Sequence, residues 1–203
     1  MNKISLVQTL DKTVFTAQDL AVLWGYSDET KLFELIKHYV RTSQIFTLAR
    51  GLYSSQDYSE EYLRENGNLL YEIANKLVPN SYVSLWTALK REGIVFQYYD
   101  EIYSVANRAV TRQVKGIRFV YKKIKNPVLL DDLGIEEVEQ SRIAGVERAI
   151  TDTLYLYPGV GLEGTGKARK ELLYKIARIY DKKVVIRKVK QLWEEQHVEH
   201  NEA

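Results

Sequence analysis

The chain contains no cysteine, and its 203 residues include only 3 prolines and 11 glycines. The absence of cysteine excludes a disulfide framework, a Cys-ligated zinc or iron–sulfur site and a thiol nucleophile. Because 45% of the residues are hydrophobic and proline and glycine are scarce, a collagen-like, low-complexity or disordered chain is also excluded. Domains usually comprise about 100 to 200 residues, so the length suits one large domain or two small ones.

Long apolar runs are missing as well. No window approaches the roughly 18 apolar residues that a membrane span needs, and the first residues lack the apolar core of a secretory signal. We therefore expect a cytoplasmic protein that has no membrane partner. The 3 histidines show no spacing with carboxylates that is typical of a metal or hydrolase site, so we expect no metal ion, no cofactor and no enzymatic activity.

Charge is distributed unevenly, although the formal net charge is only +2. No acidic residue lies between Ile102 and Leu130, an acidic run follows, and residues 167–190 are basic again. Such runs commonly form a solvated face, but a local basic face is also what a nucleic acid requires. The basic residues of the first stretch are Arg108, Arg112, Lys115, Arg118, Lys122, Lys123 and Lys125.

Residues 16–41 have the pattern of two helices joined by a tight turn. Thr16 is a good N-cap for a first helix that Gly25 ends, and Ser27 can cap a second helix with apolar residues at helical spacing. This is the helix-turn-helix pattern, in which the second helix lies in the major groove of DNA. An amphipathic stretch over residues 4–10 supplies a supporting helix.

Two short β-prone runs follow, over residues 45–49 and 52–54, and Arg50-Gly51 separates them. Glycine accepts the positive φ of a tight hairpin, and an arginine at its tip can reach a phosphate or the minor groove. The sequence therefore predicts a winged helix-turn-helix domain over residues 1–56. The residues predicted to contact DNA are Ser27, Thr30, Lys31, Glu34, Lys37, Arg41 and Arg50, of which Thr30, Lys31 and Glu34 are placed to contact base edges.

The polar stretch that follows is interpreted as a linker, and an α+β domain is predicted over residues 66–203. This domain should contain a small antiparallel sheet and end in two amphipathic helices. Apolar and basic residues nearly alternate over residues 117–122, which predicts a strand with one buried face and one basic face. Helices are predicted at 69–78 and, capped by Ser81, from 83 to Gly93; strands are predicted at 94–98, 102–106 and 117–124.

Three stretches within residues 14–155 together resemble one known family. They are the predicted winged helix with its Arg50–Tyr53 wing, the segment Ser81–Leu89 followed by Gly93-Ile94, and the segment Ile143–Asp152. In this order they resemble the AbiEi antitoxins, the predicted transcriptional regulators of abortive-infection, type IV toxin–antitoxin pairs.

This resemblance implies a regulator that binds double-stranded DNA at repeats upstream of its own operon. It also implies an antitoxin that counteracts a nucleotidyltransferase-like toxin without a stable complex between the two proteins. Antitoxin function in this family is associated with the second domain and its basic strands. The candidates for it here are Lys115, Arg118, Lys122 and Lys123.

Arg148 and Asp152 are one turn apart on a helix predicted over residues 145–156, so they can pair on one face. The pair is either a buried structural clamp or a catalytic acid pair, and the lack of a supporting histidine or carboxylate favours the clamp. Residues 161–168 match part of a phosphate-binding loop, but Ala168 stands where a hydroxyl would hold magnesium, so no nucleotide site is predicted.

Two alternatives to DNA binding remain open. Asp28, Glu29 and Glu34 leave the second helix nearly neutral, which lowers its attraction for phosphates, and the three-helix unit could be purely structural. The protein would then be a non-catalytic interaction module, in which the winged helix docks a protein and the basic sheet binds RNA or a partner protein.

Overall fold

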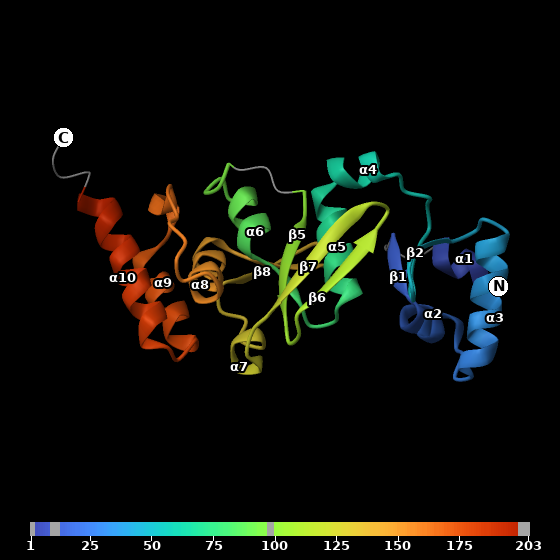
Figure 1. The fold of residues 1–203 in the computed structure, drawn as a ribbon. Coiled ribbons are helices and arrows are strands. Elements are labelled where there is room, and N and C mark those ends of the chain that lie inside the picture. Colours follow the sequence, from blue (N-terminus) through green and yellow to red (C-terminus); the bar gives the residue numbers. More distant parts are fainter. Residues whose placement is uncertain (1–2, 9–12, 97–99, 199–203) are drawn as a thin grey trace.

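The computed structural model describes residues 3–96 except 9–12, and residues 100–198 (Figure 1). The described residues form ten α-helices, one short 3-10 helix and two β-sheets, so the protein is of the α+β class. The molecule is elongated, and the N-terminal elements and the C-terminal helices lie at its opposite ends (Figure 1).

The N-terminal unit combines three helices with a three-stranded antiparallel sheet of order β1-β3-β2. Buried side chains from every helix, including Ile4, Leu20 and Ile36, pack together with Phe15 and Tyr53 from the sheet. The elements are α1 (Lys3–Gln8), β1 (Val14–Thr16), α2 (Ala17–Trp24), α3 (Glu29–Arg41), β2 (Phe46–Ala49) and β3 (Leu52–Ser54).

Side-chain caps fix where α2 and α3 begin. Thr16 and Asp19 form a capping box at the start of α2, and Gly25 ends that helix with a φ of 69°, as predicted. The predicted cap of α3 was wrong, because the N-cap is Asp28 and not Ser27. The Asp28 carboxylate accepts hydrogen bonds from the backbone N–H groups of Thr30 and Lys31 at 2.9 and 3.2 Å, and its negative charge also suits the helix dipole.

The stretch interpreted as a linker contains helix α4 (Glu60–Glu65). Tyr58 and Leu63 are buried in the larger core, so this segment is part of the fold. The linker prediction was wrong because the many polar residues around these two apolar side chains concealed their packing. Helix α5 (Gly67–Leu77) follows, close to the predicted bounds.

The larger unit is built on a six-stranded sheet of order β6-β7-β5-β4-β9-β8. The pairs β4–β9 and β5–β7 are parallel and the others antiparallel, so the sheet is mixed, not the small antiparallel sheet that we predicted. The strands are β4 (Tyr82–Val83), β5 (Ile102–Ala106), β6 (Val110–Val114), β7 (Ile117–Lys123), β8 (Ile135–Val138) and β9 (Ser141–Ala144).

Three local predictions in this unit need correction. Ser81 caps no helix: Tyr82–Val83 is a strand in the interior of the sheet, and α6 (Leu85–Arg91) begins only after Ser84. Residues 94–96 form no strand, and the rest of the strand predicted there, at 97–99, lies outside the described residues. Strand β6 was not predicted, and the Lys115-Gly116 turn joins it to β7.

Helices α7 (Asn126–Leu129), α8 (Val146–Leu156), α9 (Lys170–Ile179) and α10 (Lys183–Val198) complete the unit. The bounds of α8 and the pair of C-terminal amphipathic helices confirm the sequence-based predictions. The segment that resembles a phosphate-binding loop forms only a 3-10 turn at Thr165–Lys167. Among the described residues, no helix is both long and apolar enough to cross a membrane.

Both faces of the N-terminal sheet pack against a hydrophobic core. Alternate residues of a strand point to opposite faces, and Phe15 and Tyr53 pack into the N-terminal core while Val14 and Leu52 pack into the larger one. Helix α5 contacts β1, and strand β6 contacts β2. The sheet is therefore a shared layer between the two units.

Candidate nucleic-acid interface

A groove of about 850 Å³ lies between helix α3 and the β2–β3 hairpin. Helix α3 lines it with residues spaced three and four apart, which places them on one face. The hairpin supplies the opposite wall. The lining residues are Phe33, Ile36, Lys37, Val40 and Arg41 from α3, and Thr47, Ala49, Arg50, Gly51 and Tyr53 from the hairpin.

Three positive charges border this groove. Lys37 and Arg41 are exposed on α3, and Arg50 is exposed in the turn of the hairpin. None of the three forms an ion pair within the part of the chain that the structure describes, and no acidic residue lines the groove. The groove therefore presents uncompensated positive charge to a ligand.

Of the residues predicted to contact DNA, only Lys37, Arg41 and Arg50 line the groove. Ser27, Thr30, Lys31 and Glu34 are exposed, just before α3 or on it. Thr30 and Glu34 share an exposed face with Lys37 and Arg41, because their spacings are four, three and four residues. Lys31 differs, since its Nζ lies 3.7 Å from the Asp28 carboxylate that caps the helix.

Sequence reasoning missed the apolar part of the groove. Phe33 is 40% exposed, and Val40 and Ala49 are only partly buried. Apolar residues at helical spacing are ordinarily assigned to the core, and the sequence pattern alone does not distinguish a groove-lining residue such as Val40 from a core residue. The exposure of Phe33 could have been predicted from its position. The buried residues Leu32, Ile36 and Tyr39 follow one another at helical spacing, and Phe33 lies outside this row.

Some basic residues of the second domain already have partners within the protein, so they are less available to bind a ligand than the sequence indicated. The Nζ of Lys115 lies 2.8 Å from the Asp57 carboxylate, and Arg118 lies 2.7 Å from Glu101. Lys122 packs over the Tyr157 ring, and Lys123 is exposed. Two of the seven basic residues in the stretch without acids are thus paired with acids that precede the stretch in the sequence. The alternation predicted over residues 117–122 is confirmed, because Ile117, Phe119 and Tyr121 are buried and Arg118 is exposed.

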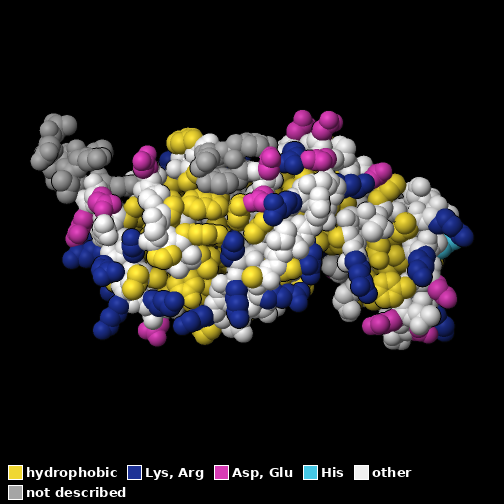
Figure 2. Space-filling view, in the orientation of Figure 1, with side chains coloured by type: hydrophobic (Ala, Val, Ile, Leu, Met, Phe, Trp, Pro, Cys, Tyr) yellow, Lys and Arg dark blue, Asp and Glu magenta, His cyan; other side chains and the backbone are white. Residues whose placement is uncertain are grey.

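On the face of the molecule that Figure 2 shows, charge is unevenly distributed. In the face shown in Figure 2, Lys and Arg side chains gather along one long edge, from the C-terminal helices toward the N-terminal unit. Acidic side chains gather on the opposite edge, where Figure 1 places α4. An anionic partner would therefore meet a favourable field along the first edge.

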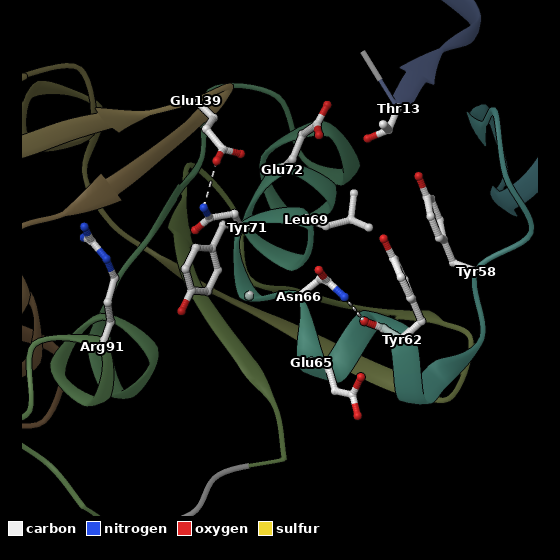
Figure 3. A pocket seen from close by; sticks show the side chains of 12 residues that line it. Thr13, Tyr58, Tyr62, Glu65, Asn66, Leu69, Tyr71, Glu72, Arg91 and Glu139 are labelled. Carbon is white, nitrogen blue, oxygen red and sulfur yellow. Dashed lines mark hydrogen bonds between the residues drawn. The ribbon is translucent and has the colours of Figure 1, made fainter. Parts of the chain in front are cut away.

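A second cavity, of about 540 Å³, lies where α4 meets α5 (Figure 3). Tyr58 and Tyr62 stack at one side of it, and Glu139 accepts a hydrogen bond from the Asn68 amide at 3.0 Å. Glu65 and Glu72 also line this cavity. The three carboxylates make it a poor site for a phosphate.

Arg148 and Asp152 are both fully buried, and Arg148 Nε lies 3.9 Å from Asp152 Oδ1. Arg148 donates from Nε to the Tyr82 hydroxyl at 3.0 Å and from its two Nη atoms to backbone carbonyls, among them that of Leu133. Asp152 accepts from the hydroxyls of Ser84, Tyr180 and Tyr82. Burial raises the pKa of Asp152, whereas the charge of Arg148 and the three hydroxyl hydrogen bonds lower it. The effect of burial is the larger, so the pKa lies above the ordinary aspartate value. A sealed network of this kind favours the clamp over the catalytic pair.

Glu147 is a nearby buried carboxylate whose pKa is shifted downward. Burial alone would raise that pKa. Hydrogen bonds from the backbone N–H and the Nε of Arg169, at 2.8 and 3.0 Å, together with the charge of Arg169, lower the pKa by more than burial raises it. The stability that Glu147 contributes is therefore present above the ordinary glutamate pKa and lost as the pH falls through its folded value.

For Glu147→Gln we expect a loss of about 1 kcal/mol in the free energy of unfolding at pH 7. This loss should shrink as the pH is lowered below the ordinary glutamate pKa, as measured by urea titrations at several pH values. Glu163→Gln, at an exposed position, is the matched control. A Glu147→Gln deficit that stays constant down to acid pH would contradict the assignment.

Neither a scan against protein-family models nor a search of the curated proteins found a match to this chain. Within the described ranges, no group of three or more His, Asp and Glu side chains is placed to hold a metal ion.

Proposed function

We propose that the N-terminal unit is a winged helix-turn-helix that binds double-stranded DNA, and that the protein is a transcriptional regulator. The element order α1-β1-α2-α3-β2-β3 supports this proposal. In it, α2 and α3 form the helix-turn-helix pair and the β2–β3 hairpin is the wing. Residues 57–65, which pack into the larger core, join this domain to the α+β domain.

The observation that carries the proposal is the set of three cations around the groove. In the proposed complex α3 lies in the major groove, Lys37 and Arg41 contact phosphates, and Arg50 contacts the backbone or the minor groove beside the wing. Thr30 and Glu34 then face base edges, where a carboxylate can accept from the amino group of cytosine. The ion pair with Asp28 gives Lys31 a smaller role than its sequence position indicated.

The resemblance to the AbiEi antitoxins supports a finer proposal. The protein would repress its own operon from upstream repeats and counteract a nucleotidyltransferase-like toxin through its α+β domain, without catalysis and without a stable complex. Among the basic-strand candidates, Lys122 and Lys123 are favoured over Lys115 and Arg118, whose charges are already paired with carboxylates.

A second candidate function is protein docking at the same groove. The partly exposed Phe33 favours it, because exposed apolar surface in a concave site is typical of protein interfaces. The basic sheet would then bind RNA or a partner protein. We prefer DNA because the cations border the groove without acids among them.

Footprinting of the DNA upstream of the protein's own gene tests the main proposal. We expect a protected stretch at modest ionic strength with the full-length protein, and loss of protection with Arg50→Ala combined with Lys37→Ala. The intact chain is required, because an isolated N-terminal unit would expose Val14 and Leu52. No protected stretch anywhere in that DNA would contradict the regulator assignment.

Co-expression with the product of the adjacent gene tests the antitoxin proposal with the same full-length variants. Loss of repression with retained rescue would assign the two functions to different domains. Failure of the wild-type chain to rescue growth would contradict the antitoxin proposal.

A further inference from the structure

The side of α3 that faces the wing carries an apolar row. Phe33 and Val40 are seven residues apart, which is about two helical turns, so they lie on the same face. Ala49 and the exposed Thr47 face them from the hairpin. Phe33 is one of few large hydrophobic side chains that are exposed in the described part of the chain, and it is not a member of the N-terminal core cluster.

Cations flank this apolar row. Lys37 follows Phe33 by one turn, Arg41 follows Val40 directly, and Arg50 lies at the tip of the hairpin. Cations in such positions contact phosphates, which border the grooves of a duplex. When these cations contact phosphates, the apolar side chains between them face the major groove of the DNA and its base edges.

The major-groove edges of the bases carry hydrogen-bonding nitrogen and oxygen groups, and only thymine adds a methyl group. The C5-methyl group of thymine is apolar, and side chains such as Phe, Ala and the methyl of Thr contact it. An aromatic ring set against hydrogen-bonding edges alone would leave polar atoms without partners. The apolar side chains in the groove of the protein therefore favour thymine among the four bases.

We propose that Phe33, together with Val40, contacts thymine methyl groups and makes the protein prefer A·T steps in its target. This inference rests on the proposed DNA-binding function, and it adds the kind of DNA sequence that the protein prefers. Each methyl group removed from water contributes about fourfold in affinity.

The test uses two duplexes that differ only in this methyl group. One is an alternating A·T duplex, and the other has deoxyuridine in place of every thymidine. Fluorescence anisotropy at fixed salt measures the ratio of the two dissociation constants for the full-length chain. We expect wild-type protein to bind the thymidine duplex at least fourfold more tightly. Phe33→Ala should lose most of this preference while it keeps most of its affinity for the deoxyuridine duplex.

Val184→Ala is the matched control, because Val184 is an apolar side chain that is 47% exposed, on α10 at the other end of the molecule. It should keep the wild-type ratio. Thermal unfolding followed by circular dichroism verifies that Phe33→Ala folds, which is expected because the side chain is exposed and alanine favours a helix.

The outcomes separate the inference from the function on which it rests. Equal binding of both duplexes by the wild type would overturn the thymine preference and leave DNA binding intact. A preference that persists in Phe33→Ala would assign the methyl contact elsewhere and overturn the role of Phe33. Binding of neither duplex would overturn both proposals and leave the groove to a protein partner.

Discussion

Arg148→Leu is expected to lower the free energy of unfolding by about 3 to 5 kcal/mol, because it leaves Asp152 buried without its ion-pair partner. The carbonyl groups of Val128, Asp131 and Leu133 lose their guanidinium donor as well. A typical domain is stable by about 5 to 15 kcal/mol, so this single change removes a large part of the total. Urea unfolding at pH 7 measures the effect.

The pH dependence of this loss identifies its cause. Burial already raises the pKa of Asp152, and removal of Arg148 raises it further. A carboxyl with a raised folded pKa binds more protons in the folded state, so its contribution to stability improves as the pH falls. The deficit of Arg148→Leu should therefore be largest at neutral pH and should shrink toward the ordinary aspartate pKa.

Arg142→Leu is the matched control, because Arg142 pairs with Asp132, whose side chain is 81% exposed. A pair of this kind contributes about 0 to 1 kcal/mol. If Arg148→Leu cost no more than this control, the buried cluster would not be a clamp.

Simultaneous replacement of Lys37, Arg41 and Arg50 by alanine is expected to reduce the salt dependence of DNA binding strongly. Each phosphate contact contributes about 0.9 to the slope of log K against log salt, so the slope should fall by about 2.7. At 0.1 M salt the affinity should fall on the order of a hundredfold. Titrations of one duplex at several salt concentrations measure both quantities.

A triple variant at Lys175, Arg178 and Lys183 controls for the loss of net charge. These residues are exposed on or beside the C-terminal helices, so the variant removes the same charge from the opposite end of the molecule. We expect it to keep most of the wild-type slope, and Lys31→Ala to change little because of its pairing with Asp28. Equal slopes in the two triple variants would contradict the proposed docking of α3.

Local features of the fold were predictable from the sequence. Thr16 and Gly25 mark the bounds of α2 because a cap and a positive φ require specific residue types. Over β7, the alternation of apolar and polar residues gave the buried face correctly. The one-turn spacing of Arg148 and Asp152 likewise indicated their pairing before their burial was known.

Features that depend on distant segments were not predictable. The strand at Tyr82–Val83 is only two residues long, and its hydrogen bonds to β5 and β9 are what define it. The acids that pair with Lys115 and Arg118 precede the basic stretch, so a count of charges along the chain missed them. The groove itself exists only because the hairpin folds back beside α3.

The burial of both faces of the N-terminal sheet also bears on how the protein is made. Residues 14–54 leave the ribosome before α5 and β6, so Val14, Leu48 and Leu52 find their partners only once these later elements have emerged. Until then the nascent chain exposes an apolar sheet face, which invites chaperone binding. Translation of at least the first 114 residues therefore precedes burial of both faces of this sheet, and prematurely truncated chains should be cleared by proteases.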